Sequence, residues 1–373
     1  MLLTIPKFNH IDNPSLKMNI KGHKTFLFLY GPLSDLEWGR GWCLASSLNE
    51  LGHEVHYLNC QTKGYQKKTL SDKGVKVYKN GFGFPFTKFP LLEGMNWFSQ
   101  QQKAKKIRSQ IRSADYLVFN GVPPKSVIDT WIKKFPEAKV LYDCADSKQD
   151  MFNDFGNTKA GERIKKWEKY LVSKCDFISG INSHVLKGLD PLKKIPQAKF
   201  PNGVSFNIKY SDHYLNSPKI KLIYCGDMGS RLDWEQLVKV LKTCPFSWSL
   251  DLYGPNRPDC KELVDLPSVN YKGLLPFNDL MEIMSEYDFG VLPYKDLISI
   301  RKSDPLKIRQ YLSAGLPVLA FPYKGLPKMR GIHILNKDLW NLDFFSLRPI
   351  PNVGIKWNWK TLANEWMACF DNK

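Results

Sequence analysis

Short apolar runs alternate with amphipathic segments along most of the chain. In the first half, the apolar runs predict buried strands at 25–30, 53–59, 75–78, 116–120, 140–142 and 176–180. After a polar stretch at 205–218 the alternation starts afresh, with predicted strands at 221–225, 248–253, 269–272 and 287–294 and predicted helices at 234–241 and 278–285. Strands that alternate with helices are typical of parallel sheets covered by helices. The pattern therefore predicts an α/β protein.

The chain is long enough for two hydrophobic cores. It has 373 residues, of which 43% are hydrophobic and 24% are charged, as in globular proteins. No stretch approaches the roughly 20 apolar residues of a membrane span, and no basic segment followed by an apolar core opens the sequence. The eight cysteines are scattered without CxxC pairs. We therefore expect two domains, no disulfide framework and a cytoplasmic location.

The second half contains a strongly patterned segment at 303–320. Ser303 or Asp304 can cap a helix, and Pro305 then occupies its first position, where a missing N–H costs nothing. Gly315 ends this predicted helix and Pro317 prevents its resumption. The apolar run that follows, at 318–321, predicts a short buried strand.

Lys307 falls in the first turn of this predicted helix, where free backbone N–H groups and the helix dipole favour an anion. Gln310 and Tyr311 follow three and four positions later and therefore share its face. A cation with an amide and a phenol beside it suits a diphosphate joined to a sugar or nucleoside. The alternative is a capped surface helix with an unremarkable lysine.

The chain is strongly basic, with 54 Lys and Arg against 36 Asp and Glu and a net charge of +18. Such a surface attracts nucleic acid, anionic lipid or phosphorylated substrates. No helix-turn-helix pattern, RNP-like aromatic motif or zinc spacing is present, so nucleic acid is not an expected partner.

A membrane surface is the second partner that the charge indicates. The aromatic stretch at 81–98 is followed by a basic one at 101–112, a combination typical of interfacial elements among acidic headgroups. The expected contact residues are Phe82, Phe84, Phe86, Phe89 and Trp97. We therefore expect peripheral association with an anionic membrane, at the inner face of the plasma membrane. An ordinary loop followed by a solvated helix face is the alternative.

Four segments resemble GT-B glycosyltransferases. SDPLKIRQYLSAGLPVLA at 303–320, EYDFGVLPY at 286–294 and KLIYCGDM at 221–228 are similar to their sugar-nucleotide-binding half, and FPNGV at 200–204 is similar to the end of their first domain. The resemblance implies an α/β GT-B fold with two Rossmann-like domains that face each other across a cleft. An acceptor-binding domain would occupy 1–205 and a nucleotide-sugar-binding domain 206–345, with a last helix in 346–373 crossing back to the first domain.

The resemblance also implies a donor site built from turns at strand ends. In these families such turns border the base and ribose, while residues of the helix segment hold the nucleotide. For each residue a packing role is the alternative, and their order along the chain is a stronger signal than any one of them. The implied donor residues are Gly226, Asp227, Met228, Tyr253, Gly254, Tyr294, Pro305, Leu306, Lys307 and Gln310.

Two carboxylates follow the apolar run at 140–142 and are candidates for a general base. Glycosyl transfer needs a base that takes the proton of the acceptor hydroxyl while the diphosphate leaves. Asp143 and Asp146 both qualify, and one of them could orient the other or cap the next helix. The segment from Tyr142 to Asp146 resembles the YxxxD motif of xanthan-type glucuronosyltransferases, which are inverting and membrane-associated. That resemblance implies Asp146 as the base.

A glycine-rich loop follows the first predicted strand, at 31–41. Its spacing is not the GxGxxG fingerprint, which disfavours a dinucleotide cofactor. In GT-B proteins the equivalent loop faces the acceptor, so the resemblance implies acceptor contacts for Gly31, Trp38, Gly39 and Arg40. A plain loop with glycine turns is the alternative.

One departure from the resembling families concerns the reaction's stereochemistry. Retaining GT-B enzymes commonly carry two glutamates with seven residues between them around this helix, where the chain has Lys302 and Gln310. This favours an inverting enzyme. No DxD triplet or His/Cys cluster is present, so we expect neither a metal nor another cofactor.

The expected function is transfer of a sugar from a nucleoside diphosphate, with uridine diphosphate as the expected nucleotide, to a glycan or lipid-linked acceptor in polysaccharide biosynthesis. The alternatives are a sugar-nucleotide epimerase on the same fold and a non-enzymatic basic protein that binds glycans or nucleotides. An epimerase would need several acidic and histidine residues in the cleft, and none of the seven histidines lies in the motifs above.

Overall fold

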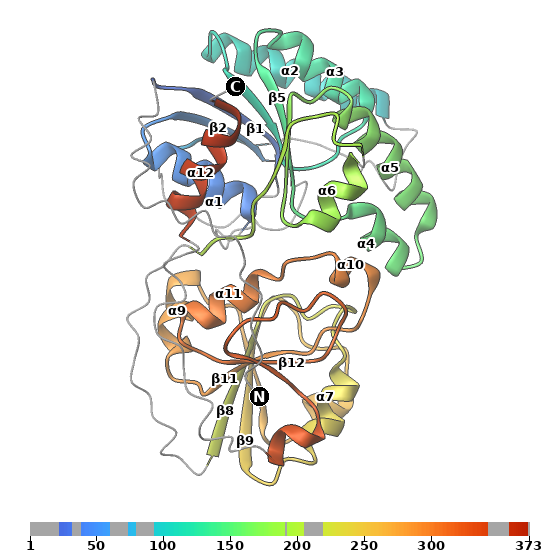
Figure 1. Ribbon diagram of the computed structural model, residues 1–373, viewed down its shortest axis with the longest axis vertical. Coiled ribbons are helices and arrows are strands. Elements are labelled where there is room, and N and C mark those ends of the chain that lie inside the picture. The colour runs from blue at the N-terminus through green and yellow to red at the C-terminus, as the bar shows by residue number, and fades with distance from the viewer. Residues whose placement is uncertain are drawn as a thin grey trace, which may run out of the picture.

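Two parallel sheets, each covered by helices, form two domains that stack end to end (Figure 1). This computed structural model describes residues 22–31, 39–59, 74–79, 93–190, 192–204, 219–341 and 358–371.

The first sheet has seven strands, in the order β3-β2-β1-β4-β5-β6-β7, and every neighbouring pair is parallel. The strands are β1 (Thr25–Gly31), β2 (Glu54–Asn59), β3 (Lys76–Lys79), β4 (Tyr116–Phe119), β5 (Lys139–Cys144), β6 (Phe177–Gly180) and β7 (Gln197–Lys199). The helices of this half are α1 (Arg40–Glu50), α2 (Glu93–Gln110), α3 (Lys125–Lys134), α4 (Lys148–Asp154), α5 (Thr158–Val172) and α6 (Ser183–Leu189).

Apolar residues on both faces of the central strands explain why this sheet is buried between two helical layers. In β1, Phe26 and Phe28 pack with α1 on one face, while Leu27 and Leu29 pack with α2 and α3 on the other. Successive side chains of a strand point to opposite faces, so a continuous apolar run is required for burial on both.

The second sheet has six parallel strands, in the order β10-β9-β8-β11-β12-β13. The strands are β8 (Lys219–Cys225), β9 (Ser247–Tyr253), β10 (Val269–Gly273), β11 (Phe289–Leu292), β12 (Val318–Ala320) and β13 (Ile332–Ile334). The helices are α7 (Trp234–Leu241), α8 (Lys261–Val264), α9 (Phe277–Met284), α10 (Ile298–Arg301) and α11 (Leu306–Ser313), with a 3₁₀ helix at Lys337–Asn341.

The last described helix, α12 (Trp359–Asp371), packs on the first domain beside α1 (Figure 1). Its Trp366, Met367 and Phe370 join the core that covers the α1 face of the first sheet. The expected domain boundaries, after 205 and after 345, lie outside the described residues and stay predictions.

The predicted strands are confirmed in position and order, and β7 and β13 are short strands that the apolar pattern did not predict. The predicted cap of the helix at 303–314 is wrong in detail. Helix α11 begins at Leu306, and the residue before it is Pro305, which provides no side-chain cap. Gly315 has φ of +78° and ends the helix as expected.

Candidate functional site

The strand order of each sheet creates a switch point at its carboxyl edge. In the second sheet β8 lies between β9 and β11, so the chain leaves the ends of β8 and β11 in opposite directions. Ligands of open α/β sheets bind at such points. The first sheet has the same arrangement between β1 and β4. A hydrogen bond from Asn182, after β6, to the carbonyl of Lys302, between α10 and α11, joins the carboxyl edges of the two sheets.

Lys307 lies beside the switch point of the second sheet, in the first turn of α11. Its side chain runs against the turn after β8, where Gly226 has φ of +134° and a Cβ would lie 2.6 Å from Lys307 Nζ. The ammonium group also lies over the ring of Tyr224, 5.6 Å from the centroid. Within the described part of the chain Lys307 forms no ion pair. The site therefore offers a positioned cation beside a helix start.

The turns after β8 and β9 contact each other through glycines. Gly226 donates its N–H to the carbonyl of Tyr253, with the atoms 2.7 Å apart. A Cβ on Gly254 would collide with the carbonyl oxygen of Gly226 and lie 3.0 Å from Met228 Cε. Gly254 is therefore needed for this close approach of backbone to backbone, while Gly226 is needed for its positive φ and for the space that the Lys307 side chain takes.

Several implied donor residues lie mainly in the core. Met228, Tyr253 and Tyr294 are 3%, 9% and 7% exposed, and the Tyr253 hydroxyl is 3.1 Å from that of Tyr287. Pro305 is buried and Leu306 is half-buried. The structure therefore gives these side chains a packing role, and their contact with a donor stays a prediction.

Tyr311 was expected to lie beside Lys307 and Gln310 on the face of the helix that contacts the ligand, but its position differs. The Tyr311 hydroxyl accepts a hydrogen bond from Cys225 N at 3.0 Å, and the ring is fully buried. The phenol thus connects α11 to β8 and does not face a ligand. Gln310 is 4% exposed and stays a candidate for a hydroxyl contact.

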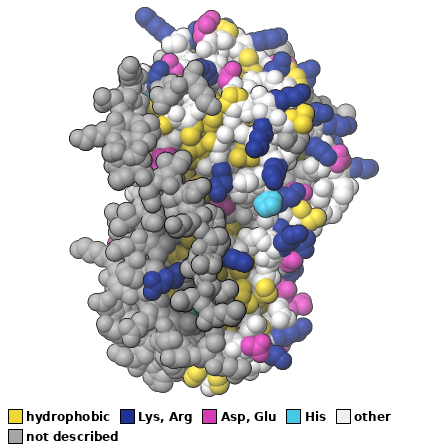
Figure 2. Space-filling model, viewed as in Figure 1, with side chains coloured by type: hydrophobic (Ala, Val, Ile, Leu, Met, Phe, Trp, Pro, Cys, Tyr) yellow, Lys and Arg dark blue, Asp and Glu magenta, His cyan; other side chains and the backbone are white. Residues whose placement is uncertain are grey.

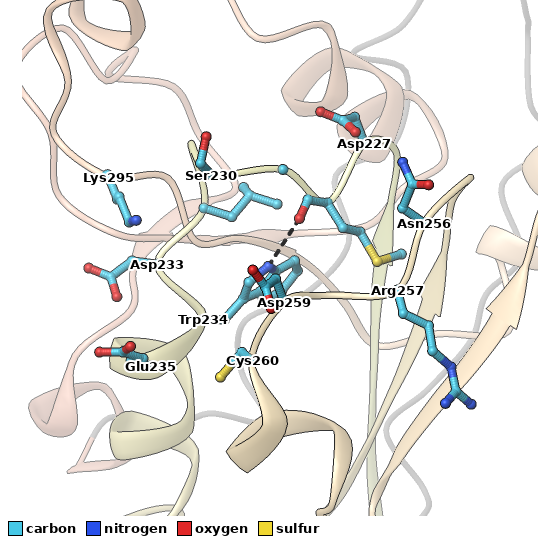
Figure 3. A pocket seen from close by; sticks show the side chains of 13 residues that line it. Asp227, Ser230, Asp233, Trp234, Glu235, Asn256, Arg257, Asp259, Cys260 and Lys295 are labelled. Carbon is cyan, nitrogen blue, oxygen red and sulfur yellow. Dashed lines mark hydrogen bonds between the residues drawn. The ribbon is translucent and has the colours of Figure 1, made fainter. Parts of the chain in front are cut away.

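A pocket of about 580 Å³ adjoins the turns after β8 and β9, on the α7 side (Figure 3). Asp233 and Glu235 lie on one side of it, and Arg257 lies on the other. It includes Asp227, which is exposed, and Met228, but not Lys307. The charged side chains of its lining are four carboxylates and two cations: Asp227, Asp233, Glu235, Asp259, Arg257 and Lys295. Because the carboxylates repel a diphosphate, this pocket suits that ligand less well than the surroundings of Lys307 do.

Asp143 is enclosed in the first domain and does not project from the end of β5. Its side chain is fully buried and forms a two-contact ion pair with Arg40, at 2.8 and 2.9 Å. Ser179 Oγ donates to it at 2.6 Å and Asn120 Nδ2 at 3.2 Å. Four donors occupy the carboxylate, which argues for a structural role and against a base that an acceptor can reach.

Arg40 is likewise enclosed. Besides Asp143 it contacts the carbonyl of Pro201 at 3.0 Å and Asn202 Oδ1 at 3.4 Å, and its guanidinium lies 5.9 Å from the centroid of the Trp359 ring. Its donors therefore serve the interior of the first domain, contrary to an acceptor contact. Gly31 ends β1 and Gly39 precedes α1, so they lie at the two ends of the loop, and their expected contact with the acceptor stays a prediction. Trp38 lies outside the described residues.

Asp146 is the more accessible of the two candidate bases. Its side chain is 37% exposed and lies 3.8 Å from Lys148 Nζ. It does not cap α4, because Ser147 precedes that helix and accepts from Asp150 N. Asp146 therefore stays the candidate base of the two.

Glu168 is a half-buried carboxylate that the motifs did not reveal. Burial raises the pKa of Glu168, although the Tyr142 hydroxyl donates to it at 2.6 Å. Its position in α5 could have revealed it, because Ile164 and Leu171 lie on the same helical face and are buried. A charged residue within an apolar stripe signals a buried polar contact.

The aromatic part of the expected membrane patch, from Phe82 to Phe89, lies outside the described residues, as does the side chain of Trp97. The neighbouring Phe98 on α2 is 60% exposed. On the face shown in Figure 2, Lys and Arg side chains are spread over both domains. In the described part of the chain no helix is long and apolar enough to cross a bilayer, and no group of three or more His, Cys, Asp or Glu has a metal-binding arrangement.

No family model and no curated protein matches the chain. Solved structures do match it. Sucrose-phosphate synthase from Thermosynechococcus elongatus has 15% identity over 94% of this chain and 99% of its own, with a TM-score of 0.70. HepE from Anabaena, solved with UDP and glucose, has 12% identity over 94% and 100%, with a TM-score of 0.65. TarM from S. aureus, solved with UDP, has 11% identity over 93% and 100%, with a TM-score of 0.63. The chain therefore has the two-domain GT-B fold that its motifs indicated.

Proposed function

We propose that this protein is a glycosyltransferase that moves a sugar from a nucleoside diphosphate, UDP in the first instance, to a glycan or lipid-linked acceptor. The observation that carries the proposal is Lys307, a cation without an ion pair in the described residues, at the start of α11 and beside the switch point of the second sheet. A fixed cation and a helix start stabilise the charge that develops on a departing diphosphate. The GT-B structures solved with UDP support the choice of donor.

The close approach of Gly226 supports the same placement. Because Gly226 has no Cβ, the Lys307 side chain can lie against this turn. In the proposal the backbone of the turn also faces a phosphate oxygen. In the proposed mechanism Lys307 binds the diphosphate and Gln310 contacts a hydroxyl of the ribose or sugar. Neutralisation by Lys307 and the helix start is sufficient without a metal ion.

The proposed base is Asp146, since Asp143 is enclosed by four donors. It would take the proton of the acceptor hydroxyl as that oxygen attacks the anomeric carbon and the bond to the diphosphate breaks. We propose inversion at that carbon, because Lys302 and Gln310 replace the glutamate pair of the commonest retaining enzymes. A role in polysaccharide biosynthesis at an anionic membrane belongs to the same proposal and rests on the net charge and the segment at 81–112.

A donor screen tests the proposal. The thermal midpoint of the protein is measured with UDP, GDP and TDP sugars, since a ligand that binds only the folded state stabilises by about 2.7 kcal/mol at 100 times its Kd. We expect a shift with one nucleotide class and none with free sugars. A positive donor is then incubated with the protein, and released nucleotide is measured. Binding without release would favour a binding protein, release of an isomerised sugar would favour an epimerase, and no shift at all would contradict the proposal.

A further inference from the structure

The six residues that lead into α11, at 299–304, are held by the first domain through five hydrogen bonds. Asp154 accepts from Ser299 N at 2.8 Å, and Asp150 pairs with Lys302 Nζ at 2.7 Å. Asn182 Nδ2 donates to the carbonyl of Lys302 at 2.6 Å. These contacts come from α4 and from the residue before α6, both at the carboxyl edge of the first sheet.

The last two bonds lie at the residue before Pro305. Asp304 accepts from the backbone N–H of Asn202 at 3.0 Å, and the Asn202 side chain donates to the carbonyl of Asp304 at 2.7 Å. Asn202 also lies beside Arg40, 3.4 Å from its guanidinium. The buried pair of Arg40 and Asp143 is thus linked through one asparagine to the lead-in of the donor helix.

The segment is firmly attached to its own domain as well. Asp304 pairs with Arg309 of α11, so the held residue is joined directly to the helix. On the other side, Asp296 accepts from Arg301 at 2.8 Å and from Lys324 N at 3.1 Å. A displacement of this segment would therefore also displace α11.

We propose that 299–304 is a clamp by which the first domain positions Lys307 relative to Asp146, and that Asp150, Asn202 and Lys302 are positioning residues for the transfer step. Helix α4 starts two residues after Asp146 and packs against α10 (Figure 1). Lys307 follows the clamp by three residues. The acceptor side and the donor side of the site are therefore fixed by the same contacts. This inference rests on the proposed function for its catalytic consequence, but not for the clamp itself.

The test uses the full chain and the pair Lys302→Ala and Arg301→Ala. Arg301 is the matched control, because its side chain is equally exposed, at 41% against 40%, and pairs with Asp296 inside its own domain. Hydrogen exchange is followed in 148–154 and 299–304. We expect Lys302→Ala to raise exchange in both segments and Arg301→Ala to leave 148–154 unchanged. The double variant with swapped charges, Asp150→Lys with Lys302→Asp, is expected to restore protection from hydrogen exchange.

The kinetic part measures transfer with the donor found in the screen. Because misplacement of reacting groups by about 1 Å can cost about 100-fold, we expect Lys302→Ala and Asn202→Ala to lower kcat about 10- to 100-fold while the affinity for UDP changes less than about twofold. Unchanged exchange in 148–154 on Lys302→Ala would refute the clamp. Raised exchange with an unchanged kcat would refute its role in positioning. If no nucleotide sugar binds the wild type, the proposed function fails and the positioning role fails with it, while exchange still decides on the clamp.

Discussion

Arg40 and Asp143 form an ion pair in the interior of the first domain, with Arg40 Nε 2.8 Å from Asp143 Oδ2 and Nη2 2.9 Å from Oδ1. The two side chains are 7% and 0% exposed. The pair joins the start of α1 to β5, and Ser179 extends it to α12, since Ser179 also accepts from Trp366 Nε1 at 2.9 Å. The carboxylate is thus part of the framework that holds α1, β5, β6 and α12 together.

Asp143→Asn is predicted to destabilise the protein by about 3–5 kcal/mol, because it leaves the buried Arg40 charge without its partner. Urea denaturation measures the change in the free energy of unfolding. Asp146→Asn is the control, since a half-exposed carboxylate should change stability by no more than about 0.5 kcal/mol. Wild-type stability of Asp143→Asn, combined with loss of transfer, would return Asp143 to the role of base.

Asp146→Asn is predicted to lower kcat by about 100-fold or more while UDP affinity stays nearly constant, because the amide keeps the size of the side chain but removes its basicity. Single-turnover measurements with saturating donor separate the chemical step from binding. Full turnover in this variant would place the base elsewhere in the first domain, with Asp35 and Glu37 of the glycine loop as the next candidates.

Gly226→Ala is predicted to weaken donor binding more than it destabilises the fold. The new Cβ would lie 2.6 Å from Lys307 Nζ, and because a lysine end is flexible, the cation would move away from its place. Gly52→Ala is the matched control, since Gly52 also has a positive φ, of +92°, but open space around it. Strain alone costs about 1–2 kcal/mol. Equal donor affinity of Gly226→Ala and Gly52→Ala would show that Gly226 is not part of the donor site.

Glu168→Gln is predicted to flatten the dependence of stability on pH. Burial raises the pKa of Glu168 above the ordinary 4.5, so the folded state binds more protons than the unfolded state between 4.5 and the raised pKa. The contribution of this group to stability is therefore fully present below 4.5 and is lost as pH rises through the raised pKa. Denaturation curves between acidic and neutral pH should show that the free energy of unfolding of Glu168→Gln increases relative to that of the wild type as pH rises. Parallel curves of variant and wild type would contradict the prediction.

Local patterns were sufficient for the strands other than β7 and β13, for the position of Lys307 and for the glycine turns. Each depends on neighbours in the sequence: an apolar run, a helix start before Lys307, a glycine directly after β8. The α/β class followed from the alternation of strands and helices, whereas the GT-B arrangement was implied by the resemblance of four segments to known glycosyltransferases.

Side-chain roles that depend on distant partners were not predictable in this way. Arg40 was expected to face the acceptor, but its partner Asp143 is 103 residues away. Asp304 was expected to cap a helix and instead binds Asn202, 102 residues away. Tyr311 has its partner in β8, 86 residues earlier. Pairings of this kind follow from how the sheets and domains pack, which periodicity does not encode.

The central claim is that α11 holds the diphosphate of a nucleotide sugar through Lys307. Calorimetric titration of wild type and Lys307→Ala with UDP, or with the nucleotide that the screen selects, tests it most directly. Loss of a charge-assisted hydrogen bond should weaken binding by about 1.5–3 kcal/mol, or roughly 10- to 150-fold. Lys242→Ala, which removes an exposed lysine paired with Glu262 in the same domain, should bind as the wild type does. Equal affinity of wild type and Lys307→Ala would remove this helix from the site and contradict the account.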